Sequence, residues 1–199
     1  MKILVIGATG TIGKSIHEYL KEKKHTVYAA HRSSTTYPVD ISDKNSIDAL
    51  FSQLPQLDAV INASGTAVWK HLSDLNEEDY MIGINSKLLG QINIVHTAEK
   101  YLKNKGAIVL TTGILGDHYE KNTVALSMVN GALHSFVNAA SNEISKNITL
   151  NIVAPGAIQG NFPKDKKFAD HYPVAIDDVV KIYEKAIHTS ETGKILKIY

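Results

Sequence analysis

Six short runs of apolar, largely β-branched residues recur along this chain, and stretches with helical periodicity separate them. The runs are residues 3–6, 26–30, 59–61, 107–110, 148–153 and 195–198. Their apolar residues are continuous rather than alternating, which is typical of strands buried on both faces of a parallel sheet. Helices are expected between them, at about residues 14–23, 43–54, 74–103, 123–146 and 177–188. The alternation predicts an α/β fold, a doubly wound parallel sheet of about seven strands with helices on both faces.

Composition narrows the class of protein. The 199 residues carry 21 Lys and Arg against 20 Asp and Glu, and this balance argues against a nucleic-acid partner. The chain has no cysteine, which excludes thiolate metal sites, and its nine histidines show no metal-ligand spacing, so no metal is expected. No segment resembles a secretory signal or a membrane span. We therefore expect one cytoplasmic domain over residues 1–199, without a membrane partner.

A glycine-rich turn follows the first predicted strand and leads directly into a predicted helix. Its residues are Gly7, Ala8, Thr9, Gly10, Thr11, Ile12 and Gly13. Glycines at such a turn allow a tight bend, close approach of the backbone to a pyrophosphate, and close packing of the helix on the strand. The N-terminus of the helix adds free N–H groups and a positive dipole. The turn predicts a dinucleotide-binding domain of the Rossmann type.

The second predicted strand ends in His31, Arg32 and Ser33. An NAD-preferring site usually has an acidic residue there, about 20 residues beyond the glycines. Arg32 can instead stack on adenine and pair with a 2′-phosphate. The segment favours NADP(H), although a solvated arginine at the strand end is the alternative and would leave NAD(H) open.

Further motifs follow in the order and spacing of one family. They are Asp40-Ile41, Asn62-Ala63-Ser64-Gly65, Asn85 and the segment Pro155-Gly156-Ala157-Ile158. With the glycine-rich turn, they make the chain resemble the short-chain dehydrogenase/reductase family over essentially its whole length.

This resemblance implies roles for the matching residues. Asp40 and Ile41 would meet the adenine, the segment from Asn62 to Gly65 would lie under the cofactor, and Asn85 would hold a water near the active site. The segment from Pro155 to Ile158 would flank the nicotinamide.

The catalytic positions depart from the family pattern. The family uses a Ser after the fifth strand and then Tyr-x-x-x-Lys on the next helix, where the lysine lowers the pKa of the phenol and holds the ribose. Here Leu126 stands at the tyrosine position and Asn130 at the lysine position. Thr112 is the expected hydroxyl, whereas a shift of one residue would place Gly113 there. Because leucine cannot donate a proton, the usual mechanism cannot operate unchanged.

Three consequences stay open. Asn130 can still hydrogen-bond the nicotinamide ribose through its amide. Tyr119 can serve as a different acid, although it precedes the usual position by seven residues and its loop can equally be a solvated one. Asp117 and His118 of the same loop are further candidates for the acid. Otherwise the protein binds NADP(H) without turnover, as a sensor or scaffold.

The leading hypothesis is an NADP(H)-dependent oxidoreductase acting on an unidentified small carbonyl or alcohol. Thr112 would polarise the substrate oxygen, Asn85 would order water and Asn130 would orient the ribose. The segment from Gly160 to Pro173 is expected to cover the substrate cleft, and Trp69 either lines that cleft or packs elsewhere. The resemblance also implies a homodimer or homotetramer, paired through helices 74–103 and 123–146.

Overall fold

The computed structural model describes residues 1–145 and 147–199, and within these residues six strands form one parallel sheet. The strands are β1 (Lys2–Ile6), β2 (Thr26–Ala30), β3 (Leu57–Asn62), β4 (Leu102–Thr111), β5 (Thr149–Pro155) and β6 (Ile195–Ile198). Their order is β2-β1-β3-β4-β5-β6, and every neighbouring pair is parallel. The chain order reverses between β1 and β3, which is the switch point of a doubly wound sheet. The predicted fold class is confirmed.

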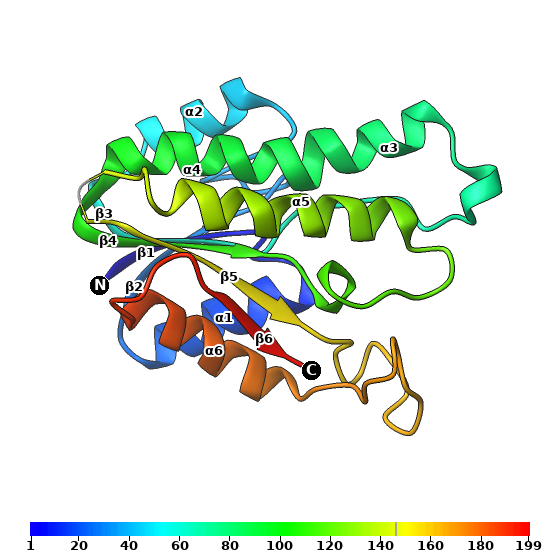
Figure 1. Cartoon of the computed structure of the whole chain (residues 1–199). Coiled ribbons are helices and arrows are strands. Elements are labelled where there is room, and N and C mark those ends of the chain that lie inside the picture. The colour runs from blue at the N-terminus through cyan, green and yellow to red at the C-terminus, as the bar shows by residue number, and fades with distance from the viewer. Residues whose placement is uncertain (146) are drawn as a thin grey trace.

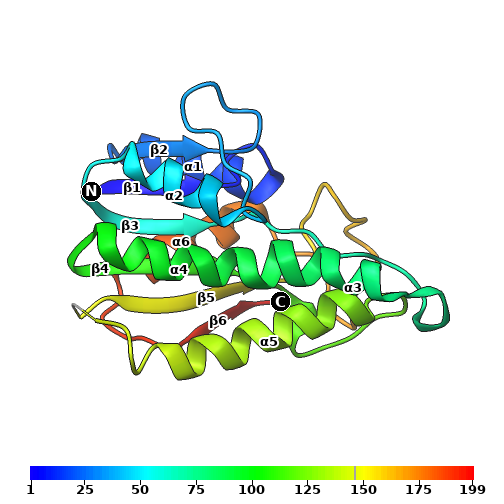
Figure 2. The same ribbon diagram turned by 90° about the horizontal axis from the view of Figure 1, so that it is seen from above.

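Helices cover both faces of this sheet (Figure 1). On one face lie α1 (Thr11–Glu22) and α6 (Ile176–His188), and on the other lie α2 (Lys44–Ser52), α3 (Glu77–Gly83), α4 (Gly90–Tyr101) and α5 (Val124–Ala140). Helices α3 and α4 are joined through η2 (Ile84–Leu89), a π-helical turn, and run beside α5 (Figure 2). None of the helices in the described residues has the length and apolar character needed to span a bilayer.

Strand β1 shows why the continuous apolar runs are strands. Ile3 and Val5 face the core formed with α1 and α6, whereas Leu4 and Ile6 face the core formed with α2, α4 and α5. All four side chains are fully buried. A strand that is buried on both faces needs apolar residues at every position, because successive side chains point to opposite sides.

The structure differs from the predicted element bounds in three places. The described residues form six strands rather than about seven, because residues 156–175 make only isolated bridges and contain Pro163 and Pro173, which lack the N–H that a sheet ladder requires. The stretch predicted as a helix over 74–103 gives way to β4 at Leu102. The helix predicted over 123–146 ends at Ala140, and residue 146 lies outside the described part of the chain.

Candidate active site

Two cavities lie at the carboxyl ends of the strands, where ligands bind in open α/β sheets. The first, of about 440 Å³, contains residues that directly follow β1, β2 and β3. The second, of about 450 Å³, contains residues that directly follow β4 and β5. The two cavities adjoin, because residues close together in the chain line different ones. Gly10 lines the first and Ile12 the second, and Ser86 lines the first and Lys87 the second.

The glycine-rich turn forms one wall of the first cavity. Gly7 has φ +87°, and a Cβ added there would lie 2.9 Å from the backbone of Ala63. A Cβ on Gly13 would lie 2.2 Å from the Gly7 carbonyl oxygen, so this glycine brings α1 against the turn. At Gly10 the nearest atom would be 3.6 Å away, and the described side chains provide no cap for α1 at this residue. The first turn of α1 therefore presents N–H groups suited to an anion.

The end of β2 places a cation at the edge of the first cavity. Arg32 Nη2 lies 3.2 Å from Asp40 Oδ2, and the arginine side chain is three-quarters exposed. Hydrogen bonds from Ser42 hold the pKa of Asp40 below its usual value, and the Arg32 charge adds to this effect. Asp40 thus stays anionic and tethers Arg32 beside the cavity. Ser33 supports His31, with its Oγ 3.2 Å from His31 Nδ1.

Hydrogen bonds of a buried side chain fix the conformation of the segment after β3. The Asn62 side chain is fully buried; its Nδ2 donates to the Ser64 carbonyl at 3.0 Å and its Oδ1 accepts from Ser64 Oγ at 2.6 Å. These bonds fold the loop so that Ala63, Ser64 and Gly65 line the cavity. Asn62 is therefore a positioning residue in this structure.

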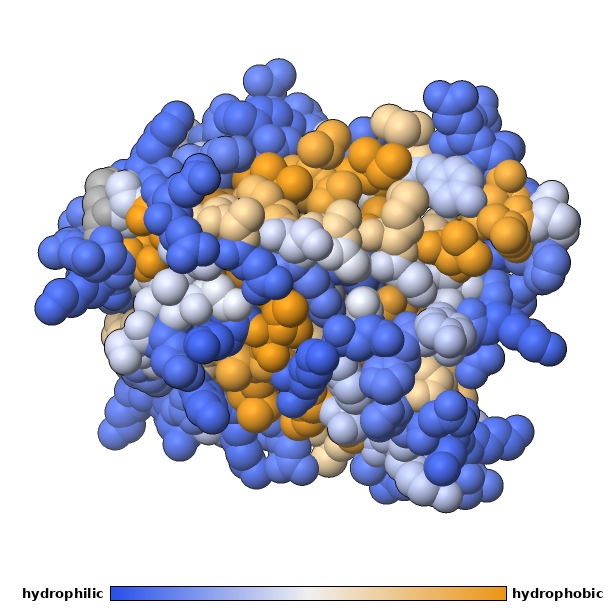
Figure 3. All heavy atoms as spheres, viewed as in Figure 1, coloured by the Kyte–Doolittle hydropathy of each residue, from blue (hydrophilic) through white to orange (hydrophobic). Residues whose placement is uncertain are grey.

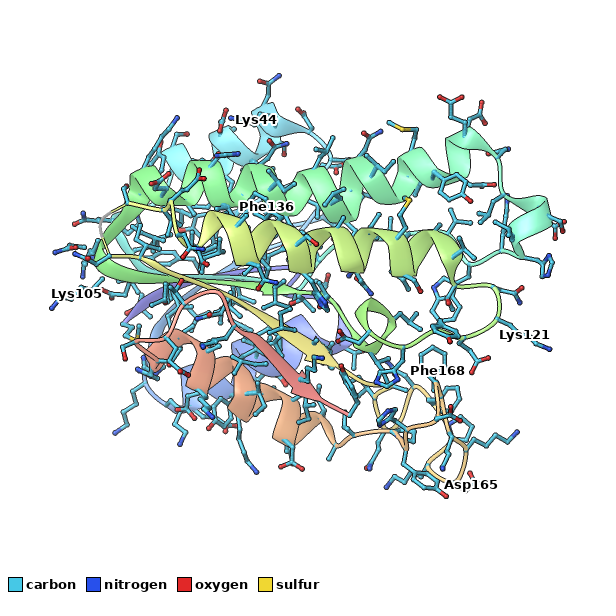
Figure 4. All side chains as sticks on the ribbon, viewed as in Figure 1. Lys44, Lys105, Lys121, Phe136, Asp165 and Phe168 are labelled. Atoms are coloured by element: carbon cyan, nitrogen blue, oxygen red, sulfur yellow. The ribbon has the colours of Figure 1, made fainter. Side chains whose placement is uncertain are left out.

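Aromatic and aliphatic side chains form the outer wall of the second cavity. The rings of Trp69 and Phe168 lie 5.9 Å apart, and those of Phe162 and Phe168 lie 5.7 Å apart. Phe168 belongs to the loop of residues 156–175 beyond β5 (Figure 4). Asn161 of the same loop donates to Thr11 Oγ1 at 3.0 Å, which ties the loop to the start of α1. Trp69 thus lines the cleft, and the loop lies over it as expected.

A polar relay leads from the second cavity toward solvent. Thr112 Oγ1 lies 2.9 Å from His134 Nε2, and both side chains are buried. His134 Nδ1 faces Asp117 Oδ1 at 3.9 Å. Asp117 Oδ2 accepts from the Tyr199 hydroxyl at 2.7 Å and lies 3.1 Å from Lys197 Nζ. We refer to Thr112, His134 and Asp117 as the relay.

Electrostatics sets the resting charges of the relay. Burial lowers the pKa of His134 below its ordinary value of 6.5, although the Asp117 carboxylate works against this shift. Burial acts to raise the pKa of Asp117, but hydrogen bonds from Tyr199 and Lys197 outweigh it, so that pKa lies below its usual value. At neutral pH the histidine is therefore neutral and the carboxylate is charged.

Lys87 and Asn130 line the inner part of the second cavity. Lys87 is 8% exposed, and its Nζ donates to the Thr111 carbonyl at 3.4 Å. Burial lowers the pKa of Lys87 to about 8. Asn130 is 2% exposed, and its Oδ1 has no hydrogen-bond partner in the described part of the chain.

The structure gathers most of the predicted site residues around the two cavities. The first is lined by Gly7, Thr9, Gly10, His31, Arg32, Ile41, Ala63, Ser64 and Gly65, and the second by Ile12, Thr112, Asn130, Pro155, Gly156 and Ile158. The others in contact with them are supporting residues: Thr11, Gly13, Ser33, Asp40 and Asn62.

Two predicted catalytic residues are placed elsewhere. Asn85 is exposed and lies in a separate depression with residues of α3, because its neighbours Ser86 and Lys87 take the inward positions of the π-helical turn. Tyr119 is 85% exposed on the loop before α5. Lys87 and His134 take part in the site although the motifs did not single them out.

Comparison with known proteins identifies the family. The model of the family described as enoyl-(acyl carrier protein) reductase matches residues 12–181. An uncharacterized oxidoreductase, YmfI of Bacillus subtilis (strain 168), is 29% identical over 203 residues, which cover 86% of this chain and 83% of that protein. The chain belongs to the short-chain dehydrogenase/reductase family of oxidoreductases.

Solved structures share the whole fold of this chain. The protein lin1944 from Listeria innocua is 35% identical, covers 100% of both chains and superimposes with a TM-score of 0.94. A small-chain dehydrogenase in complex with NADPH superimposes with a TM-score of 0.88 at 22% identity, covering 100% of this chain and 96% of that one.

Proposed function

We propose that this protein is an NADP(H)-dependent reductase of small, uncharged carbonyl compounds. The single observation that carries the proposal is the relay, because it brings a hydroxyl in contact with an imidazole to a cavity beside a dinucleotide-type site. The proposal agrees with the NADPH bound to a protein of the same fold.

The residues of the first cavity fit a dinucleotide. The space at Gly10 and the free start of α1 suit a pyrophosphate, and Arg32 suits a 2′-phosphate. Asn130 offers an unpaired acceptor to the same ligand. When bound, the nicotinamide supplies or accepts the hydride.

The relay would handle the proton. The Thr112 hydroxyl binds the carbonyl oxygen of the substrate and gives its proton to that oxygen, while His134 Nε2 returns a proton to Thr112 Oγ1. Asp117 stabilises the imidazolium that precedes this transfer, and its partial exposure lets solvent restore the proton. In the reverse direction the neutral His134 receives the alcohol proton through Thr112. The missing tyrosine is thus replaced by a threonine and a histidine.

The walls of the second cavity indicate the class of substrate. Among the described residues that line it, Lys87 is the charged one, and the outer wall is formed by Trp69, Phe162, Phe168 and Leu126. Such a cavity favours an apolar or aromatic carbonyl over a carboxylate-bearing one, because the latter would lose its hydration without a partner at that wall.

Turnover tests the proposal. Purified protein is assayed for NADPH consumption with aryl aldehydes and ketones, and with 2-oxo acids as the charged comparison. We expect turnover of the aryl carbonyls and little with the acids. Retained NADPH binding without turnover of any carbonyl would instead favour the sensor or scaffold function, to which the leucine at position 126 points.

We also propose that the protein acts as a cytoplasmic homodimer formed through α3, α4 and α5. Apolar side chains gather over these helices on the molecular surface (Figure 3). They include Met81 and Ile82 of α3, Leu89 of η2, and Val124 and Met128 of α5, each at least 39% exposed. An apolar face of this kind is typical of a protein interface.

A further inference from the structure

Two buried polar groups of the second cavity lack suitable partners among the described residues. The Lys87 ammonium has three donor hydrogens, yet its hydrogen bond in the described part of the chain is a long one to the Thr111 carbonyl. No carboxylate in that part pairs with it: neither the hydrogen bonds nor the ion pairs of the described residues include one. Asn130 Oδ1, likewise buried, accepts no hydrogen bond there.

Such an arrangement is unfavourable unless a ligand satisfies both groups. Burying a charged group without a counter-ion, or an acceptor without a donor, costs free energy that folding does not recover. One donor and one acceptor that line the same cavity would both be satisfied by a ligand that accepts and donates. The two residues therefore indicate a polar part of a ligand at the inner end of the second cavity.

The path of Lys87 places this polar part at the junction of the two cavities. A Cβ added at Gly65 would lie 3.1 Å from Lys87 Cγ, so the lysine stem runs along the Gly65 backbone. Gly65 lines the first cavity and Lys87 lines the second. The π-helical turn η2 carries the lysine inward, and such turns occur frequently at functional sites.

We propose that Lys87 and Asn130 together bind the ribose on the nicotinamide side of NADP(H). Lys87 Nζ donates to the ribose diol and Asn130 Oδ1 accepts from it. A diol suits this pair because each hydroxyl both donates and accepts. The lysine that the family pattern places at position 130 is thus supplied from η2, on another helix. This inference rests on the proposed function, since it requires a dinucleotide in the first cavity.

Binding measurements with two ligands test it. NADPH carries the ribose in question, whereas adenosine 2′,5′-bisphosphate carries only the adenosine half. Both are titrated calorimetrically into wild-type protein, Lys87→Met and the control Lys121→Met, which changes an exposed loop lysine. Methionine keeps the buried stem and removes the charge. We expect Lys87→Met to weaken NADPH binding at least tenfold, with binding of the bisphosphate changed less than twofold and the control unchanged.

A second variant guards against a folding defect. Asn130→Leu removes the acceptor without touching Lys87, and we expect it to weaken NADPH binding at least threefold with bisphosphate binding unchanged. Wild-type affinity for NADPH in both variants, or an equal loss for both ligands, would overturn the assignment while leaving the proposed function standing. If wild-type protein bound neither ligand, the proposed function would fail together with this inference.

Discussion

Thr112 and His134 are 22 positions apart in the chain, yet their side chains meet at 2.9 Å beside the second cavity, which Thr112 lines. Their contact depends on the helical repeat of α5, since Leu126, Asn130 and His134 are spaced by four and share one face of that helix. This spacing is a signal that could have singled out His134. For Lys87 the sequence offers no comparable signal, because an ordinary α-helical turn would not predict its inward position.

A pH profile tests the role of His134. Reduction requires the imidazolium, and the pKa of His134 lies below 6.5, so we expect kcat for carbonyl reduction to rise as the pH falls toward that pKa. Alcohol oxidation requires the neutral imidazole and should rise with pH over the same range. In His134→Gln both slopes should vanish and kcat should fall about 10²-fold or more. The control His96→Gln, at an exposed position of α4, should keep the wild-type pH profile. If His134→Gln also kept that profile, His134 would have no part in the proton transfer.

Replacement of the buried Lys87 is expected to stabilise the fold of the cofactor-free protein. Its folded pKa of about 8 lies below the ordinary 10.5, so its burial destabilises the fold fully below pH 8, and this effect disappears as the pH rises toward 10.5. Lys87→Met should therefore raise the free energy of unfolding at pH 7, by at most about 3 kcal/mol. Urea denaturation at pH 7 and pH 10.5 measures this. A variant that is less stable than wild type at pH 7 would show that the lysine serves the fold.

At the scale of elements, the strands were the most predictable part of the chain. Each of the six apolar runs became a strand because residues such as Ile3 and Leu4 must be buried on opposite faces of the sheet. The glycine-rich wall of the first cavity was also predictable from local sequence, because the residues of the turn from Gly7 to Gly13 themselves impose its geometry. The relay and the inward position of Lys87 depend on how elements that are distant in the chain pack together. The local sequence pattern carries little information on this packing.

The short turn η3 (Ile114–Gly116) makes room for the relay. A Cβ on Gly116 would lie 2.4 Å from His134 Cε1, so Gly116→Ala should displace the imidazole from Thr112. We expect its kcat to fall by a factor similar to that of His134→Gln, with NADPH affinity within twofold of wild type. Gly131→Ala is the matched control, because a Cβ there meets no atom within 4 Å; it should keep full activity. Full activity in Gly116→Ala would show that the contact is dispensable.

At the scale of the whole molecule, one helical face of the sheet and the carboxyl ends of the strands differ in what they present outward. The elements α3, η2 and α5 expose the apolar side chains named above, whereas the loop beyond β5 and the strand ends line the candidate site (Figures 3 and 4). The proposed site and the proposed interface therefore lie on different surfaces.

Introduction of a charge at this apolar face tests the dimer. Met128 is 40% exposed on α5, and Met128→Glu would bury a carboxylate at each copy of the interface. We expect light scattering to give a dimer for wild type and a monomer for Met128→Glu. Lys21→Glu, on α1 at the opposite face, should stay dimeric. A wild-type monomer at micromolar concentration, or a dimeric Met128→Glu, would contradict the assigned surface.

The most direct test of the proposed chemistry compares three proteins in one NADPH-consumption assay with an aryl aldehyde: wild type, Thr112→Ser and Thr112→Val. The valine variant keeps the shape of the side chain but removes the hydroxyl that would carry the proton. We expect turnover in wild type, retained turnover in Thr112→Ser, and a loss of about 10²- to 10⁴-fold in Thr112→Val with NADPH affinity unchanged. Turnover in Thr112→Val equal to that of wild type would contradict proton transfer through the relay.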